Sequence, residues 1–86
     1  MKVLIPSPLF SYTGGRKAVE AEGRTLEEVT RSLDRSFPGL RFRVVDEQGR
    51  IRPHIKFFVN RVQTFELSTP VGPADEVAIV NAFSGG

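Results

Sequence analysis

The chain has 86 residues, enough for one small domain with a single hydrophobic core. Hydrophobic residues make up 40% of it and charged residues 26%, so a disordered chain is disfavoured, and no apolar run is long enough to span a membrane. The absence of cysteine and the single histidine exclude a disulfide framework, a thiolate zinc site and a cysteine nucleophile. The lack of cysteine also agrees with a reducing compartment, and we expect the protein in the cytoplasm.

The net charge of +2 comes from arginines that are interleaved with acidic residues. This pattern is typical of a solvated surface, and the aromatic-basic motifs of RNA-binding sheets are missing. We therefore expect neither a nucleic acid nor a membrane among the partners.

The first elements predicted are two strands joined as a β-hairpin. Within residues 2–5, Val3, Leu4 and Ile5 suit a strand, which ends near a pair of prolines. Gly14 and Gly15 tolerate positive φ in a turn, and residues 17–23 then alternate apolar and acidic side chains. The glycines do not predict a phosphate-binding loop, because the Walker pattern requires a longer glycine-bracketed loop that opens a helix.

An amphipathic helix of about three turns is predicted within residues 25–39. Thr25 can cap this helix, and Glu28 can reach back to complete a capping box. Glu27 and Arg31 form a favourable pair four residues apart. The apolar side chains that recur at helical spacing are Leu26, Val29, Leu33 and Phe37. We expect this stripe to rest on a sheet.

The second half of the chain is predicted to consist mostly of strands. Residues 40–45 alternate apolar and arginine side chains and predict a strand, followed by a turn at 46–49. Further strands are expected within 54–60 and 62–67, before a loop that contains proline and glycine. The last strand, within 76–82, is apolar on both faces, so we expect it to be central, covered on both sides and parallel to the first.

The order of hairpin, helix and further strands is that of the β-grasp, or ubiquitin-like, fold. We predict an α+β domain at residues 1–81, with a mixed sheet of four to five strands and one main helix packed on one face. Residues 82–86 are predicted to form a flexible C-terminal Gly-Gly tail.

The two terminal glycines are the feature that most directly indicates a chemistry. A tail without side chains can enter a narrow channel and present its α-carboxylate to another protein's nucleotide site. Coupling this carboxylate to AMP would create a good leaving group, so that a sulfur nucleophile or an amine could attack the carbonyl carbon. The chain has no thiol of its own to attack the activated end.

Intrinsic catalysis is not expected. His54 has no second histidine, cysteine or carboxylate pair at ligand spacing, so we predict neither a metal site nor a catalytic role for it. So small a domain can scarcely enclose a Ser-His-Asp site with its oxyanion hole. We expect a protein co-substrate of partner enzymes, with no intrinsic cofactor.

Three segments resemble the ubiquitin-like sulfur carrier proteins of the MoaD/ThiS family. They are "FFVN" at 57–60, "ADEVAIV" at 74–80 and the ending "AFSGG" at 82–86. The first half, from "IPSPLFSYTGG" onward, is similar to the CysO-like branch, which delivers sulfur for cysteine synthesis. The resemblance implies a β-grasp fold and a non-enzymatic carrier.

The resemblance also implies that an E1-like adenylyltransferase, using ATP and magnesium, adenylates Gly86, which then becomes a thiocarboxylate. Gly85, which has no side chain, precedes this sulfur-bearing position in the tail that enters the partner. Phe83 and Ser84 fall where the tail enters the partner's channel, and Phe58 is expected on the docking surface. Further expected partners are a sulfur donor enzyme, a sulfur-accepting synthase and, if the gene continues past Gly86, a processing protease.

Other functions remain open at this point. The chain could be the small subunit of molybdopterin synthase, although Arg61 stands where many relatives have glycine. A ubiquitin-like modifier would join Gly86 to lysines of targets, and Lys2, Lys17 and Lys56 could accept it in self-conjugates. A small binding module would carry its Gly-Gly end incidentally.

Overall fold

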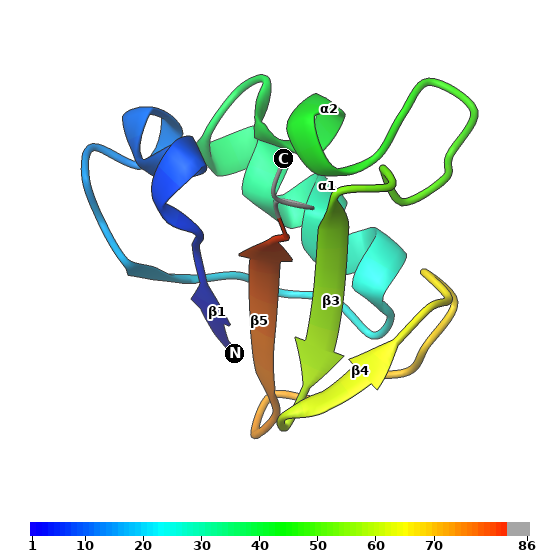
Figure 1. Cartoon of the computed structure of the whole chain (residues 1–86). Helices are drawn as coiled ribbons and strands as arrows, with labels where there is room; N and C mark the ends of the chain where they lie inside the picture. The colour runs from blue at the N-terminus through cyan, green and yellow to red at the C-terminus, as the bar shows by residue number, and fades with distance from the viewer. Residues whose placement is uncertain (83–86) are drawn as a thin grey trace.

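The strands form one five-stranded sheet. Figure 1 shows the α-helices behind this sheet. The computed structural model describes residues 1–82. The strands are β1 (Lys2–Leu4), β2 (Ala18–Glu20), β3 (Ile55–Val59), β4 (Val62–Thr64) and β5 (Glu76–Asn81). The helices are the 3-10 helix η1 (Ser7–Tyr12) and the α-helices α1 (Leu26–Ser36) and α2 (Leu40–Val44).

The strand order β2-β1-β5-β3-β4 places the last strand of the chain at the centre of the sheet. β1 and β5 pair in parallel, with Val3 opposite Val77, and the other neighbouring strands pair antiparallel. The parallel pair requires a long connection between its strands, and that connection includes α1. The mixed sheet with one main helix confirms the predicted α+β architecture, the central position of the last strand and its direction relative to the first.

α1 forms where the sequence predicts. Thr25 Oγ1 accepts a hydrogen bond at 3.3 Å from the backbone N–H of Glu28, which satisfies one free donor of the first turn. The Glu28 carboxylate accepts at 2.9 Å from the backbone N–H of Arg24, so this half of the predicted capping box is displaced by one residue. The stripe residues that are fully buried are Leu26, Val29 and Leu33.

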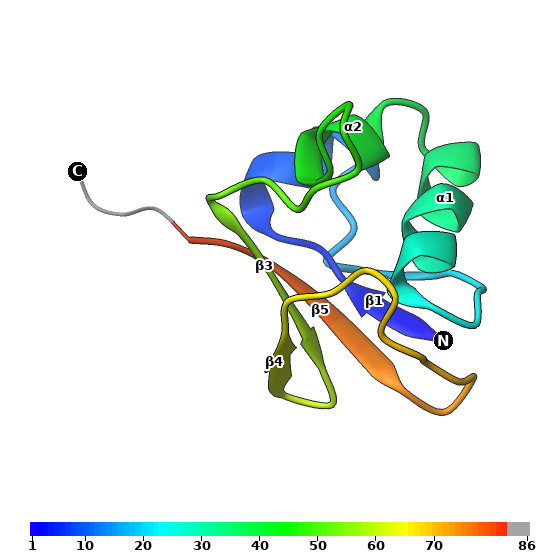
Figure 2. The same ribbon diagram turned by 90° about the vertical axis from the view of Figure 1, so that its right-hand side faces the viewer.

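The hydrophobic core lies between the inner face of the sheet and the helices (Figure 2). Phe57 on β3 is its largest fully buried side chain; Val77 is fully buried on the neighbouring strand β5, and Val3 on β1, the strand beyond it in the sheet order. Burial of each such side chain stabilises the fold by roughly 1.5–3 kcal/mol. The alternation along β3 and β5 therefore assigns one face of the sheet to the core.

Residues 40–44 form the helix α2, and the strand predicted there is wrong. Leu40 and Val44, four residues apart, are both fully buried, whereas Phe42 is 55% exposed, which is the period of a helix. Gly39 begins this helix in the left-handed conformation, at φ 94°, which lets the chain turn back from the end of α1.

Two further predictions need correction. β1 and β2 pair antiparallel as predicted, but the segment 5–17 between them contains η1 and is not a tight turn. β5 is not covered on both sides, because no helix of the described chain crosses the outer face of the sheet, and Val80 there is 38% exposed (Figure 2). The predicted turn at 46–49 and the strands within 54–60 and 62–67 are confirmed.

Candidate functional site

The chain leaves the sheet at the end of β5, and strand pairing fixes this point. β1 accompanies β5 only as far as Ala78, whereas β3 stays paired with it up to Asn81, which lies opposite Ile55. The backbone N–H of Ala82 then donates to the carbonyl oxygen of His54 at 2.7 Å. The root of the predicted tail is therefore held by Ile55, the first residue of β3, and by His54 just before it.

The predicted tail, residues 82–86, begins at this point, and Ala82 is its described residue. The residues predicted for activation and for recognition lie outside the described part of the chain; they are Phe83, Ser84, Gly85 and Gly86. Their roles, and the boundary after residue 81, stay predictions. The structure supplies the place from which they start, which is the end of the central strand.

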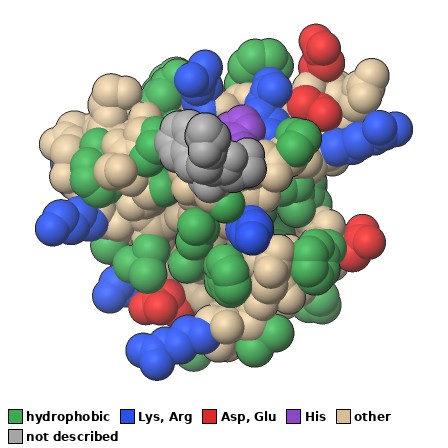
Figure 3. All heavy atoms as spheres, viewed as in Figure 1, with side chains coloured by type: hydrophobic (Ala, Val, Ile, Leu, Met, Phe, Trp, Pro, Cys, Tyr) green, Lys and Arg blue, Asp and Glu red, His purple; other side chains and the backbone are tan. Residues whose placement is uncertain are grey.

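Phe58, the predicted docking residue, lies on the outer face of the sheet, because its neighbour Phe57 faces the core. Across the strands, Phe58 lies opposite Ala78 on β5, and Ala78 lies opposite Leu4 on β1. Val80 extends this row toward the end of β5. We call Leu4, Phe58, Ala78 and Val80 the outer apolar patch, and Figure 3 shows hydrophobic side chains across this face.

Charged side chains frame the outer apolar patch. Lys2 pairs with Glu76 at 3.8 Å toward the start of β5, and Lys56 lies opposite Val80 toward its end. Sequence reasoning names Phe58 but misses the three other members of the patch, because apolar runs suggest strands covered on both faces. Lys2, Lys56 and Glu76 lie on the same face of the sheet as the patch, and these charged residues are the signal that could have marked this face as solvent-facing.

The start of β5 is fixed by a network around Asn60. The Asn60 side-chain amide donates to Asp75 Oδ1 at 2.8 Å, and Asn60 Oδ1 accepts from the backbone N–H of Glu76 at 2.9 Å. Asp75 Oδ2 accepts from the backbone N–H of Gly72 at 2.8 Å. The hydrogen bond from Asn60, and then the one from Gly72, hold the pKa of Asp75 below its ordinary value. The adjoining residue Arg61 has a φ of 72° in this turn.

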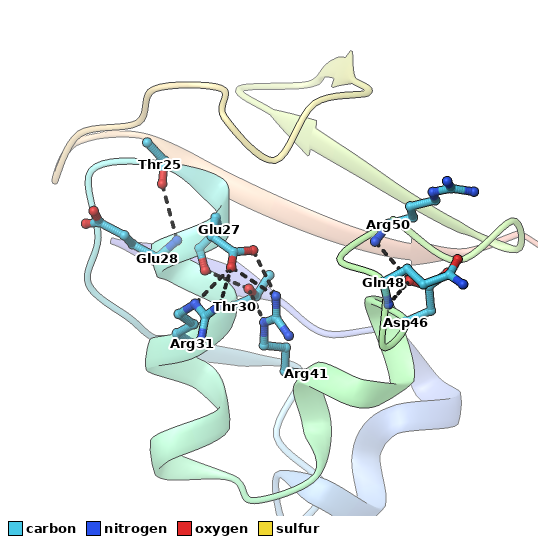
Figure 4. Close-up of polar contacts among 9 residues, drawn as sticks. All are labelled: Thr25, Glu27, Glu28, Thr30, Arg31, Arg41, Asp46, Gln48 and Arg50. Atoms are coloured by element: carbon cyan, nitrogen blue, oxygen red, sulfur yellow. Dashed lines mark hydrogen bonds and ion pairs between the residues drawn. The ribbon is translucent and has the colours of Figure 1, made fainter.

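A second polar network joins α1 to α2 (Figure 4). Arg41 Nη2 donates to both carboxylate oxygens of Glu27, at 2.9 and 3.0 Å, and Arg41 Nε donates to Thr30 Oγ1 at 3.1 Å. Arg31 Nε donates to the same carboxylate at 2.8 Å, which confirms the predicted pair. Burial alone would raise the pKa of Glu27, but the hydrogen bonds and charges of Arg41 and Arg31 lower it overall. This network positions α2 and its exposed Phe42.

A hollow of about 500 Å³ opens beside the root of the tail. Apolar residues of η1 and β3 line it together with the polar side chains of Arg43, Arg52, His54 and Asn81. The guanidinium carbon of Arg52 lies 4.6 Å from the ring centroid of Phe42, and Arg52 Nε donates to the Phe42 carbonyl oxygen at 2.7 Å. These two contacts attach the loop after α2 to α2 itself, beside the hollow at the root of the tail.

Within residues 1–82, no group of three or more metal-ligating side chains could hold a metal ion. Over the same residues, none of the helices combines the length and the apolar character needed to cross a bilayer. The described chain therefore offers an apolar sheet face, a basic hollow and the root of the tail as its candidate functional features.

Comparison with known proteins identifies the class. The ThiS family matches residues 3–86, and the chain belongs to this family. Among curated proteins, the sulfur carrier protein CysO of Mycobacterium tuberculosis is 33% identical over 89 residues, which cover 98% of this chain and 96% of CysO.

Solved structures agree with this assignment. A chain of the BexX/CysO complex of Amycolatopsis orientalis superposes with a TM-score of 0.90 at 32% identity, covering 99% of this chain and 98% of its own. SAMP1 from Haloferax volcanii superposes with a TM-score of 0.79 at 26% identity, covering 100% and 98%. The predicted β-grasp fold and the resemblance to sulfur carriers are confirmed. Because the relatives are sulfur carrier proteins by name, the prediction of a carrier and not an enzyme is confirmed as well.

Proposed function

We propose that the chain is a sulfur carrier whose Gly86 carboxylate is adenylated by an E1-like enzyme and converted to a thiocarboxylate. This group then donates sulfur to the biosynthesis of cysteine or of another sulfur-containing metabolite. The observation that carries the proposal is the position of β5, because the central strand of the sheet leads directly into the segment that ends in Gly85 and Gly86. The similarity to CysO over nearly the whole chain supports it.

The chemistry balances with groups that the carrier and a partner supply. A carboxylate oxygen of Gly86 attacks the α-phosphorus of ATP, and pyrophosphate leaves, so an acyl adenylate forms. Hydrosulfide then attacks the carbonyl carbon, and AMP leaves with the electron pair on its phosphate oxygen. The product is a thiocarboxylic acid that ionises to the thiocarboxylate. ATP and magnesium are bound by the activating enzyme in this scheme.

The described residues contribute binding and orientation. Val77 and Ile79 are buried and anchor β5, so the tail starts from a fixed point. The outer apolar patch beside this strand is the surface that we propose for docking, with Phe58 near its centre. An exposed apolar patch with a charged rim has the composition of a protein interface.

The expected partners are proteins. An E1-like adenylyltransferase activates Gly86, a sulfur donor enzyme supplies the sulfur, and a synthase accepts it. A relative solved as the BexX/CysO complex supports association with another protein. A processing protease joins this set if the gene continues beyond Gly86.

Intact-mass spectrometry tests the proposal. The carrier is incubated with its E1-like enzyme, ATP, magnesium and sulfide, and its mass should rise by the difference between one sulfur and one oxygen atom. Two controls, deletion of Gly86 and addition of one residue after it, should show no change. An unmodified parent chain, in the presence of an enzyme shown to activate a CysO protein, would contradict the proposal.

Conjugation to lysine is the second candidate function, and the similarity to SAMP1, a small archaeal modifier protein, favours it. In this case an amine replaces hydrosulfide in the second step, and an isopeptide bond forms at Gly86. Chymotrypsin cleaves after Phe83, so each conjugated lysine would keep a short Ser-Gly-Gly remnant. Remnants on cellular proteins that disappear in the Gly86 deletion would establish conjugation, and their absence would exclude it under those conditions.

A further inference from the structure

Basic side chains gather around the end of β5 (Figure 3). Two adjoining hollows border the start of β3, and they share Arg52 and Ile55 in their linings. The cationic or titratable side chains that line them are Arg43, Arg52, His54 and Lys56, which we call the basic collar. No aspartate or glutamate lines either hollow, whereas carboxylates line each of the three other hollows described on the molecule.

No member of the basic collar forms an ion pair within the described residues. The ion pairs found there involve Lys2, Arg31, Arg41 and the N-terminus, and none involves a member of the collar. Asp46 offsets part of the charge of Arg52: the pKa of this carboxyl is lowered first by the backbone hydrogen bond from Arg50, at 3.0 Å, then by that from Gln48, at 2.9 Å, and also by the charge of Arg52 (Figure 4). The collar therefore presents positive charge to whatever approaches this end of the sheet.

The collar stands directly at the root of the tail. Lys56 lies opposite Val80, and the carbonyl oxygen of His54 holds the backbone N–H of Ala82. The residues from Phe83 to Gly86 can span at most about 14 Å when fully extended. An enzyme that encloses Gly86 must therefore bring its own surface to within this distance of Ala82, and so against the collar.

The aromatic neighbour of the collar adds contact area. Phe42 is 55% exposed and carries Arg52 stacked on its ring. Arginine and aromatic side chains are enriched at the energetically important positions of protein interfaces. Burying this surface together with unpaired cations is costly unless the partner places anions opposite them.

We propose that the basic collar docks on an acidic rim around the tail channel of the activating enzyme, and thereby guides Gly86 into the nucleotide site. This inference rests on the proposed function and names the partner surface that it requires. The collar acts on the encounter with the enzyme and on binding. Reversing its charge should therefore change KM and the dependence of KM on salt concentration, and should leave kcat close to that of the parent.

The test compares two double charge reversals with the parent chain. Arg43→Glu with Lys56→Glu reverses two exposed members of the collar and spares Arg52, whose side chain is bonded to Phe42. Arg24→Glu with Arg61→Glu is the matched control, because it changes the net charge equally near the opposite end of β5. Far-ultraviolet circular dichroism and thermal melting establish that each variant is folded.

Two readouts are measured with the E1-like enzyme encoded in the same genome: its affinity for the carrier by calorimetry, and carrier-dependent ATP–pyrophosphate exchange at several salt concentrations. We expect the collar variant to weaken binding and raise KM at least tenfold, to keep kcat within twofold, and to lose most of the salt dependence. The control should stay within twofold of the parent.

The proposal would be overturned if the collar variant and the parent had equal KM and equal affinity. It would also be overturned if the control variant lost as much affinity as the collar variant. A collar variant that loses affinity only for the sulfur-accepting enzyme would also overturn it. If the parent binds the activating enzyme in a collar-dependent way but is not adenylated, the docking surface stands and the proposed function fails. If the parent neither binds nor is adenylated, both fail.

Discussion

Replacing Arg61 by glycine is expected to stabilise the protein. Arg61 occupies the left-handed region at φ 72°, next to Asn60 at φ 50°, in the turn between β3 and β4. For residues with a Cβ this conformation costs roughly 1–2 kcal/mol, and glycine adopts it without that penalty. The position is held by its neighbours, because Asn60 is bonded to Asp75 and to the backbone of Glu76. The surrounding structure therefore imposes the strain on Arg61.

The net gain is smaller than the strain that is relieved. Glycine makes the unfolded chain more flexible, which offsets roughly 0.5–1 kcal/mol. The Arg61→Gly variant should therefore gain about 0.5–1 kcal/mol in its free energy of unfolding. For a domain of this size that corresponds to a rise in melting temperature of about 2–8 °C.

Urea unfolding at neutral pH, with thermal melting as a second measurement, checks this expectation. Asn60→Gly is the contrasting variant: it relieves the same kind of strain but removes the hydrogen bonds to Asp75 and Glu76, so it should be less stable than the parent. A decrease in stability for Arg61→Gly would show that the arginine side chain contributes contacts that outweigh its strained backbone.

Three other variants test different parts of the molecule. Gly23→Ala should lose about 2–3 kcal/mol in urea unfolding, since φ is 152° and a Cβ would lie 2.8 Å from the backbone nitrogen of Val29. Glu27→Gln should cost about 1 kcal/mol at pH 7. Because the folded pKa of Glu27 is lowered, that contribution is present above the unfolded pKa and lost as pH falls through the folded one, so the stability gap between parent and variant should narrow steadily as the solution is acidified below the ordinary pKa of a glutamate. Phe58→Asp should leave the melting temperature within a few degrees but raise KM for the activating enzyme at least tenfold; an unchanged KM would refute docking through the outer apolar patch.

The elements that sequence reasoning predicts correctly are those whose local signals agree with their tertiary environment. α1 has a capping threonine at Thr25 and a stripe of apolar residues, and all of these point to the same helix. β3 shows alternation because one of its faces is buried and the other is not, as Phe57 and Phe58 illustrate. The central position of β5 follows from its apolar composition, which is needed wherever strands lie on both sides.

The elements that were not predictable depend on contacts distant in sequence. Residues 40–44 satisfy both a strand and a helix pattern, and only the burial of both Leu40 and Val44 decides for the helix. The exposure of Val80 depends on which face of the sheet the helices leave open, and no local pattern specifies this. The basic collar is assembled from α2, the loop after it and β3, so the spacing of its members along the chain gives no signal.

The pairing of β5 also limits how far the tail can be drawn into an enzyme. Beyond Ala78 the strand is bonded only to β3, so pulling on the tail would first break the bonds that hold Ala82 and Asn81 to the start of that strand. Val80 is 38% exposed and can follow at little cost, but Ile79 is buried, and withdrawing it would cost roughly 1.5–3 kcal/mol. Fraying should therefore stop at Ile79, so the tail cannot be drawn far from the sheet without opening the core, and the activating enzyme has to approach the end of β5.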